Sequence, residues 1–555
     1  MLSVILAIVC IIFAVVYGYF WHRSRFFIRR GIPGPKPTSV FSGNLLELQT
    51  DRSPFNKSFM KWEDEYGSTF GYLEGGQKVI CTSDLSILHD VFGKKFENFH
   101  SRKPIHPFPF NPDKDERANV FTARGLRWKR LRTLTSPSFN PQKLRNMQVT
   151  MLDTTRKVMK VFDDLEGQEI NVCKLFLESS TDVIERIAFG KEESGVGKTT
   201  NPVTLLIRAF FNPAPFIENP LINFYVGTFE FQDWTIYLHK VLVKIVGSPL
   251  TKLGEILVKT IEKRRALAVE RKSQEAEEMN QLNNNEDVNG NGSLKNQYED
   301  FIDLFLNSEA SEDDIKSIEN NNNRLGGGEL SKAKIEKRLS DQEIISMCSV
   351  LMLAGVDTTA TAMSCFAYCL ATNPEAQEKL IEEIDDYILE EEDINMDNVN
   401  SMQYLDWCIK ESMRVLPLAG GANSRICMNT CTVGNQNLLM EEGMTVVSNF
   451  WSIHHDPKYW GDDAEDFVPE RWDPELDRIP KDPYAYQPFG LGPRQCMGMK
   501  FGLLEIKLMF CHLLKNFRIE ATQNTKIHMA GIIVCGPHDV TVTLRRRVNA
   551  AEQDC

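Results

Sequence analysis

The sequence predicts a mainly α-helical protein with a small β-sheet region, an α+β fold, behind an N-terminal membrane-spanning helix. Residues 150–270 and 344–370 carry apolar side chains that are typical of helices packed in a core. Residues 69–82 indicate a hairpin that turns at its glycine pair, and residues 443–450 indicate a buried strand. The chain has 555 residues, which suffices for several domains or for one large helical enzyme.

The first element is an apolar segment, Leu2 to Trp21, that contains no charged residue. A helix of this length spans the roughly 30 Å hydrocarbon core of a bilayer. The short apolar region and cleavage site of a signal peptide are missing, so a signal anchor over residues 1–22 is preferred to a cleaved peptide. Because arginines follow directly, the positive-inside rule places the rest of the chain in the cytosol. They are Arg23, Arg25, Arg29 and Arg30.

A basic and proline-rich segment, residues 23–37, joins the anchor to a folded domain that occupies residues 38–555. Prolines at every second position of its last part predict a stiff extended hinge. Residues 273–335 are rich in asparagine and glycine and cannot bury a core. We expect them to form disordered surface inserts around one helical island, residues 300–306.

The net charge limits the kinds of molecule that the protein can bind, and the cysteine content indicates its redox compartment. A formal net charge of -13 argues against nucleic acid, which attracts a basic surface. The 13 cysteines show no disulfide framework, which indicates a reducing compartment. The pairs Cys365/Cys369 and Cys427/Cys431 have the spacing of metal ligands, but no matching His or Cys cluster accompanies them. Packing cysteines are therefore the preferred interpretation.

The most informative stretch is the loop from Phe489 to Gly498, which delivers Cys496 to the start of a helix. The first N–H groups of a helix have no intrahelical partner and its dipole favours negative charge, so a thiolate is stabilised there. Phe489 offers an aromatic face and Arg494 a fixed cation. Glycines let the backbone approach a flat ligand closely; they are Gly490, Gly492 and Gly498. A buried structural cysteine is the alternative.

A second constellation lies on the helix that begins at Gly125. Trp128 and Arg132 are four residues apart and share one face, where an indole N–H and a guanidinium together suit a carboxylate. By itself this spacing also fits an ordinary surface helix. Lys129 and Arg130 point elsewhere, and belong either to a basic docking patch or to a plain solvated face.

The long apolar helix over 344–370 begins at a capping box of Ser340 and Glu343. A second membrane span is the alternative, but Asp357 and Thr358 in its middle would be costly in lipid. The Thr358 hydroxyl can bond back to the carbonyl of Ala354 and open the helix locally. Small residues there, including Gly355, would leave room for a ligand, and Asp357 adds a titratable carboxylate.

Three further signals follow along the chain. Asn373 and Pro374 restart a helix, with the asparagine as its N-cap. Glu411 and Arg414 form an i, i+3 ion pair that alone contributes little. A Pro-Glu-Arg-Trp segment later supplies Arg471.

Taken together, these motifs resemble the cytochrome P450 superfamily, whose haem-binding signature Phe-x-x-Gly-x-Arg-x-Cys-x-Gly is filled at every fixed position of residues 489–498. The resemblance implies a P450 fold and a bound haem b. It implies Cys496 as the axial ligand of the iron and Asp357 and Thr358 as a proton relay. It makes Glu411, Arg414 and Arg471 a structural lock. The implied haem contacts are Trp128, Arg132, Arg425, Phe489, Arg494, Cys496 and Gly498.

The resemblance also implies a haem-thiolate monooxygenase that inserts one oxygen atom of O₂ into an apolar substrate. Electrons would come from NADPH–cytochrome P450 reductase, and cytochrome b5 is a further candidate partner. The enzyme would sit in the endoplasmic reticulum membrane as a single-pass protein with a cytosolic catalytic domain. Loops at 101–122 and 206–235 would cover the substrate. A haem-thiolate isomerase or dehydratase acting on peroxides, and a haem-based gas or lipid binder, are the alternatives.

The sequences of two short segments narrow the resemblance further. Trp-Lys-Arg-Leu-Arg from Trp128 and His-His-Asp-Pro-Lys-Tyr-Trp from His454 are most similar to the P450 clan of broad-specificity, drug-metabolising animal enzymes. They also resemble the nematode branch of that clan.

Overall fold

The computed structural model describes residues 2–49, 55–103, 111–197, 201–211, 237, 241, 252, 254–266, 300–320, 336–418, 420–531 and 534–547. Parts of both expected substrate loops, and most of the expected inserts at 273–335, lie outside the described residues.

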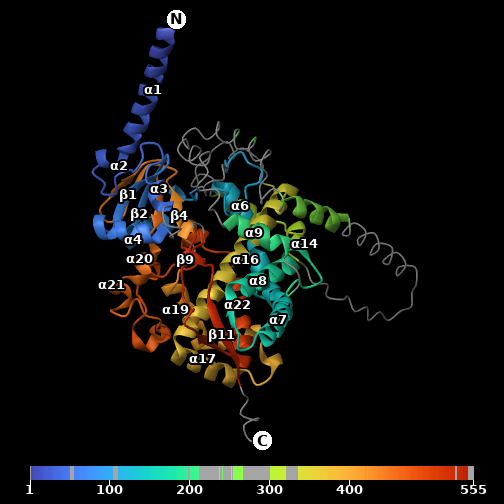
Figure 1. Ribbon diagram of the computed structural model, residues 1–555. Helices are drawn as coiled ribbons and strands as arrows, with labels where there is room; N and C mark the ends of the chain where they lie inside the picture. The colour runs from blue at the N-terminus through green and yellow to red at the C-terminus, as the bar shows by residue number, and fades with distance from the viewer. Residues whose placement is uncertain are drawn as a thin grey trace, which may run out of the picture.

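The N-terminal helix α1 (Leu2–Ser24) projects away from the rest of the chain, and the short helix α2 (Phe26–Arg29) follows it at the edge of the folded part (Figure 1). Among the described residues, two helices are long and apolar enough to cross a membrane, namely Ser3–Ser24 of α1 and α16 (Asp341–Thr372). Only 6% of the apolar window of α1 is buried, against 44% for α16. By this measure α16 is a core helix and α1 is the candidate span.

A four-stranded sheet lies beside α2 and carries the predicted hairpin. Its order is β1-β2-β7-β4, in which β1 (Thr69–Glu74) and β2 (Gln77–Thr82) are antiparallel and turn at Gly75 and Gly76. The predicted strand is β7 (Thr445–Ser448), which runs parallel to β2 and is buried along its whole length. The outer strand β4 (Ser424–Ile426) pairs with β7. Both strand predictions are confirmed.

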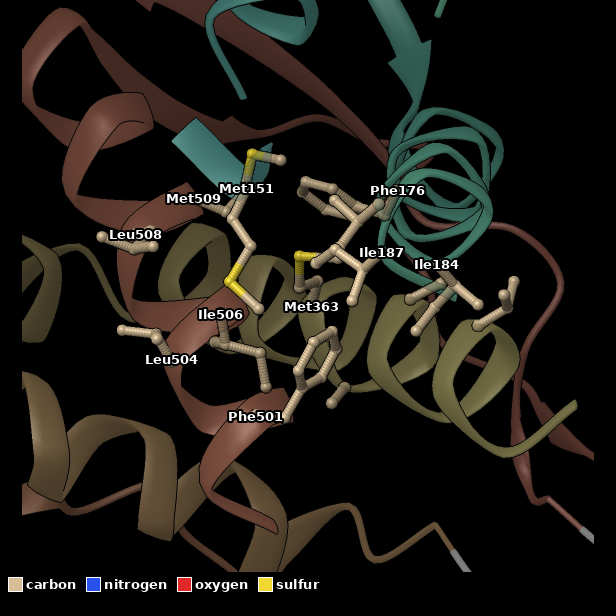
Figure 2. Packing of buried hydrophobic residues seen from close by; sticks show 14 of the residues in the cluster. Met151, Phe176, Ile184, Ile187, Met363, Phe501, Leu504, Ile506, Leu508 and Met509 are labelled. Carbon is tan, nitrogen blue, oxygen red and sulfur yellow. The ribbon is translucent and has the colours of Figure 1, made fainter. Parts of the chain in front are cut away.

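The helical core is formed by four long helices that cross one another. They are α7 (Pro141–Asp164), α8 (Val172–Phe189), α16 and α22 (Met499–Asn516). Figure 2 shows Ile184 and Ile187 of α8, Met363 of α16 and Phe501 of α22 meeting in one apolar cluster. Burial of each such side chain contributes about 1.5–3 kcal/mol, so this cluster fixes how α22 is placed.

The start of α16 agrees with the sequence, and a new helix begins at Pro374 after Asn373 as predicted, but the asparagine side chain has another partner. Ser340 and Glu343 form the predicted capping box, with Ser340 Oγ accepting from the Glu343 N–H at 3.2 Å. At the other end, the Asn373 side chain does not cap α17 (Pro374–Tyr387). Its amide donates instead to the carbonyl of Cys369 at 2.8 Å, because an orphan carbonyl at the end of α16 lies within reach.

Two helices are seen within the segment that was expected to be an insert. The predicted island is α14 (Phe301–Leu306), whose Phe301, Ile302 and Phe305 are buried in the main core. A second helix, α15 (Glu312–Asn320), was not anticipated. The island is therefore part of the core and not a surface element.

The remaining elements connect these parts. The remaining strands described by the structure are β3 (Glu169–Asn171), β5 (Cys431–Val433), β6 (Leu438–Met440), β8 (Phe517–Ala521), β9 (Met529–Ala530), β10 (Gly536–Pro537) and β11 (Thr541–Arg546). The further helices are α3 (Leu45–Gln49), α4 (Phe55–Tyr66), α5 (Leu85–His89), α6 (Gly125–Thr135), α9 (Pro202–Phe211), α18 (Met396–Ser401), α19 (Gln403–Val415), α20 (Phe450–His455) and α21 (Pro457–Trp460). A π-helical turn, η1 (Asp90–Lys94), and short 3₁₀ turns complete the described part of the chain.

Candidate functional site

The cysteine loop is closed by its own backbone before α22 begins. The Cys496 N–H donates to the Phe489 carbonyl at 2.8 Å, and the Gln495 N–H donates to the Gly492 carbonyl at 3.0 Å. Gly490 and Gly492 adopt φ values of 75° and 66°, which favour glycine. A Cβ at Gly492 would lie 1.9 Å from the Phe92 carbonyl oxygen of η1, so glycine is required for this contact. The loop is thus held in one shape by the protein.

Cys496 is accessible at its surface, although the surrounding chain displaces much of its water. This desolvation raises the pKa of its thiol, while the Gly498 N–H and the charges of Arg102 and Arg132 lower it. The sequence predicted that the helix start alone would favour the thiolate. In the bare protein desolvation is the larger effect on this pKa, and a metal cation bound to the sulfur would favour the thiolate.

Four arginines gather around this loop. Arg494 donates to the carbonyls of Phe121 (3.3 Å) and Ala123, and its guanidinium lies 4.7 Å from the Trp128 ring. Arg132 donates to the Gln495 carbonyl at 2.9 Å. The other two are Arg102 and Arg425.

Arg102 and Arg425 complete the cluster from the sheet side. Arg102 donates to the Arg494 carbonyl at 2.6 Å. Arg425, at the middle of β4, donates to the Leu491 carbonyl at 3.2 Å and lies 4.4 Å from the Phe92 ring. Both side chains therefore touch the cysteine loop directly.

The cluster has positive charge without a counter-charge among the described residues. Burial, followed by the mutual repulsion of the arginines, holds the pKa of Arg425 and of Arg494 well below the usual range and lowers that of Arg102 to about 10. The Nε atoms of Arg102, Arg425 and Arg494 are buried without a hydrogen-bond partner. Buried charges of one sign are costly unless an opposite charge joins them, so the site is incomplete without an anionic group.

These features fit haem. A haem brings two carboxylates for the guanidiniums, a flat face for Trp128 and the glycine loop, and an iron that takes a thiolate ligand. Trp128 is buried, with its ring 5.4 Å from that of Phe96, and Phe489 is half-buried on the main core. Gly498 caps α22 with an ordinary φ of -86° and has no close neighbour at its Cβ position, so nothing in the chain itself requires glycine there.

A pocket of about 230 Å³ opens beside Cys496 between α6 and the start of α22. Its lining combines basic and apolar side chains; the residues are Arg132, Ser136, Phe139, Asn140, Pro141, Gln495, Cys496, Met497, Met499 and Lys500.

Asp357 and Thr358 lie half-buried in the middle of α16. Thr358 Oγ1 donates to the Ala354 carbonyl at 2.5 Å, as predicted from the sequence. Gly355 has a different role from the one expected, because a Cβ there would lie 2.7 Å from the Ile184 side chain. It lets α8 pack closely on α16, whereas Ala354 is exposed and leaves open space beside Thr358.

Comparison with known proteins decides the family. The model of the cytochrome P450 family matches residues 33–541. Cytochrome P450 CYP13A8 of Caenorhabditis elegans is 34% identical over 97% of this chain and 99% of its own length. CYP13A10 of the same nematode is 35% identical over 99% and 100%, respectively.

The chain belongs to the cytochrome P450 family. Its relatives place it in the nematode branch, and its helix-rich fold with small sheets agrees. It is a haem-dependent P450 monooxygenase, a class of oxidoreductase that takes electrons from a redox partner and acts on hydrophobic substrates.

This P450 contains the predicted Glu-x-x-Arg lock. Arg414 donates to both oxygens of Glu411, at 2.9 and 2.8 Å, and Arg471 donates to the same carboxylate at 3.1 Å. Trp472 Nε1 adds a further bond at 2.9 Å. Glu411, Arg414 and Arg471 are fully buried, so the prediction that Arg471 is the third member is confirmed.

Two basic residues have contacts that the sequence analysis did not anticipate. Arg130 donates to Glu343 of α16 at 2.8 Å and to two backbone carbonyls, so it joins α6 to α16 and does not serve a docking patch. Arg102 was missed because it lies in a proline-rich loop without periodicity. Its short distance to the cysteine loop is visible only in three dimensions.

Proposed function

We propose that this P450 is a membrane-anchored haem-thiolate monooxygenase with Cys496 as the axial ligand of haem b. The observation that carries the proposal is the four-arginine cluster around the cysteine loop, which lacks a carboxylate partner among the described residues. When bound, haem supplies the activation of O₂. The chain supplies the thiolate and the cations.

We assign the haem propionates to the four guanidiniums, with the Trp128 indole beside them. Arg102 and Arg425 approach from the sheet side, and Arg132 and Arg494 from α6 and the loop. Guanidiniums bind carboxylates through paired hydrogen bonds, which would also satisfy the orphaned Nε atoms. Phe489 and Gly498 would contact the face of the ring near the sulfur.

Asp357 and Thr358 are assigned to proton delivery on the other side. Thr358 holds its hydroxyl proton on the Ala354 carbonyl, so its oxygen is oriented as an acceptor toward the open space there. Asp357 can take up a proton from solvent and pass it on. This pair would supply protons while the site stays otherwise dry.

Thr358→Ala tests this assignment. Loss of the hydroxyl should leave NADPH consumption but lower the amount of product formed per NADPH, because proton delivery becomes misdirected. The control is Thr372→Ala, which removes an equivalent bond to a carbonyl (2.8 Å) at the exposed end of α16. Equal coupling in both variants would contradict the relay.

We further propose the endoplasmic reticulum membrane as the location, with α1 as a single span and the rest of the chain in the cytosol. The arginines after α1 favour that orientation. NADPH–cytochrome P450 reductase would be the electron donor, with cytochrome b5 as a second candidate, and the substrate would be an apolar small molecule. The test is reconstitution with reductase, NADPH and ¹⁸O₂ over a panel of lipids, steroids and drugs. Incorporation of one labelled oxygen atom supports the proposal, and rearrangement of hydroperoxides without reductase, with no labelled oxygen incorporated from O₂ into any substrate, contradicts it.

A further inference from the structure

Two cysteines stand at the two ends of the turn that connects β4 to β5. Cys427 directly follows β4, and Cys431 is the first residue of β5. The Cys427 N–H donates to the Met444 carbonyl at 2.8 Å, and the Cys427 carbonyl accepts from the Gly443 N–H at 2.8 Å. The segment that leads into β7 therefore holds the backbone of Cys427 in place.

The side chains of the two cysteines are neighbours. Cys427 Sγ lies 3.5 Å from the Met440 carbonyl oxygen of β6. Met440 is the direct cross-strand partner of Cys431 in the β5–β6 hairpin. The Cys431 thiol is close enough to the Cys427 thiol to form a hydrogen bond with it. The fold of the hairpin therefore brings the two sulfur atoms together.

The two thiols differ in their access to solvent. Cys427 is buried in the apolar cluster under the sheet, which also contains Ile80 of β2, Val446 of β7 and Leu491, whereas Cys431 packs at its edge and is partly exposed. Burial, followed by the charge of Cys431, raises the pKa of Cys427 to about 12. Because a buried thiol with a high pKa reacts slowly with an oxidant, the exposed Cys431 is the residue that reacts first.

The surroundings of the pair favour redox chemistry over metal binding. A zinc site needs further ligands, and within the described ranges no group of three or more His, Cys, Asp or Glu side chains could hold a metal ion. Two adjacent thiols without further ligands are the arrangement from which a disulfide forms. In a reducing compartment such a pair rests as two thiols and oxidises only while an oxidant is present.

We propose that Cys427 and Cys431 form a reversible disulfide when the protein meets hydrogen peroxide. The Cys431 thiolate attacks the peroxide and the O–O bond breaks, which gives a sulfenic acid and a hydroxide that takes up the proton released by Cys431. The Cys427 sulfur then displaces the sulfenic hydroxyl, which takes up the Cys427 proton and leaves as water. In total, two thiols lose two electrons to form one disulfide, and one peroxide is reduced to two water molecules.

The first step also prepares the second. Oxidation of Cys431 to a sulfenic acid removes the charge that contributes to the high pKa of Cys427. The buried thiol then meets an electrophilic sulfur within contact distance, and no other cysteine has to approach.

The disulfide would fix the end of β4. Arg425 lies two residues before Cys427 and donates to the Leu491 carbonyl of the cysteine loop at 3.2 Å. A cross-link restricts the movement of the chain that follows Arg425, so it should help this side chain to keep its position. This consequence rests on the proposed haem site, whereas the formation of the disulfide does not.

The test treats the full-length haem protein with hydrogen peroxide, stops the reaction with catalase, blocks the remaining thiols and maps every cysteine by mass spectrometry. The chain contains its own matched control, because Cys365 and Cys369 have the same spacing but are both buried in α16. We expect a disulfide between Cys427 and Cys431, its loss after treatment with dithiothreitol, and two free thiols at the control pair.

Two variants test the order of the steps. Cys427→Ser should leave a sulfenic acid on Cys431 that dimedone labels, because the second thiol is missing. Cys431→Ser should leave Cys427 as a thiol, because burial protects it. Dimedone labelling of Cys427 in Cys431→Ser at the level seen for Cys431 in Cys427→Ser contradicts this order.

Three results would overturn the disulfide site. The first is free thiols at both positions after peroxide treatment. The second is Cys431 oxidised beyond a sulfenic acid beside an unreacted Cys427. The third is equal disulfide formation at Cys365 and Cys369, which would show that the chain had unfolded before it was oxidised.

The link to Arg425 has its own measurement. Haem transfer to apomyoglobin is compared between the peroxide-treated protein and the same sample after reduction with dithiothreitol and removal of the reductant, so that any damage to haem is equal in both. The disulfide form should lose haem more slowly, and Cys431→Ser should show no difference. Equal rates in the wild-type protein overturn this consequence and leave the disulfide site intact. A wild-type chain that binds no haem contradicts the proposed function and leaves the result of the thiol mapping unaffected.

Discussion

Arg102 and Arg494 are each held by backbone carbonyls and repelled by each other. Their hydrogen bonds position the guanidiniums but do not neutralise them, and both keep a buried Nε without a partner. A neutral side chain at either position would relieve repulsion in the bare protein but remove a partner for haem. The site therefore gives up stability of the unliganded chain in favour of binding an anion.

Arg102→Gln should change haem binding and apoprotein stability in opposite directions. Loss of one charged hydrogen bond should weaken haem retention by about 1.5–3 kcal/mol, whereas the apoprotein should unfold at a higher temperature. The control is Arg145→Gln, which breaks an exposed pair with Asp397 and should change neither quantity much. The haem-to-protein ratio after transfer to apomyoglobin, together with thermal unfolding, gives both values. Destabilised Arg102→Gln apoprotein would contradict the explanation.

Glu505 of α22 has a buried carboxyl group that accepts a hydrogen bond from Ser180 Oγ at 2.7 Å. Burial raises its pKa from 4.5 to about 7. The folded state then holds a proton that the unfolded state releases above pH 4.5. Protonation of Glu505 therefore makes its full contribution to stability below that pH, and this contribution is lost as the pH rises to about 7. The loss amounts to about 3 kcal/mol.

Glu505→Gln should remove this dependence, because the amide keeps an acceptor for Ser180 but never ionises. Urea unfolding at pH 5 and pH 7.5 should show the wild-type chain losing more stability than the variant. Parallel curves for the two proteins would show that Glu505 does not titrate in this range.

At the scale of elements, the sequence predicted the helices and strands whose formation depends on local interactions. The β1–β2 hairpin and the long helix α16 were predicted because alternation, glycine turns and a capping box act over a few residues. The burial of α14, the second helix α15 and the turned Asn373 were not predicted. Each depends on a tertiary contact that the local sequence does not reveal.

The candidate site likewise contains residues that could be predicted from the local sequence and residues that could not. Cys496 and its loop could be predicted because the whole motif is continuous in sequence. Gly355 was misinterpreted because its neighbour Ile184 comes from another helix. Arg102 was missed because only folding brings it to the Arg494 carbonyl.

The Glu-x-x-Arg lock joins α19 to the Pro469–Trp472 turn. Glu411 accepts bonds from two buried arginines and one indole, so its charge is fully compensated. Glu411→Gln leaves buried positive charge unpaired and should cost about 3–5 kcal/mol of unfolding free energy. Glu470→Gln, which disturbs a more exposed pair with Lys379, should cost at most about 1 kcal/mol. Denaturant unfolding measures both, and similar values would contradict the lock.

At the scale of the whole molecule, the cysteine loop joins two apolar clusters. Leu491 packs in the cluster under the sheet, whereas Phe489 and Met497 pack on the helical core. Arg425 reaches the loop from β4, while α22 continues from it into the core (Figure 1). Haem bound at this junction would connect the sheet region to the helices, so its presence should matter for the stability of both.

The proposed chemistry depends most on a bond between the Cys496 sulfur and haem iron. The most direct measurement is the absorption of the reduced, carbon monoxide-bound protein, for the wild-type chain and for Cys496→His. We expect the band typical of thiolate ligation in the wild-type protein and its loss in the variant. Persistence of that band in Cys496→His, or a wild-type preparation that stays colourless with haem in excess, would contradict the account.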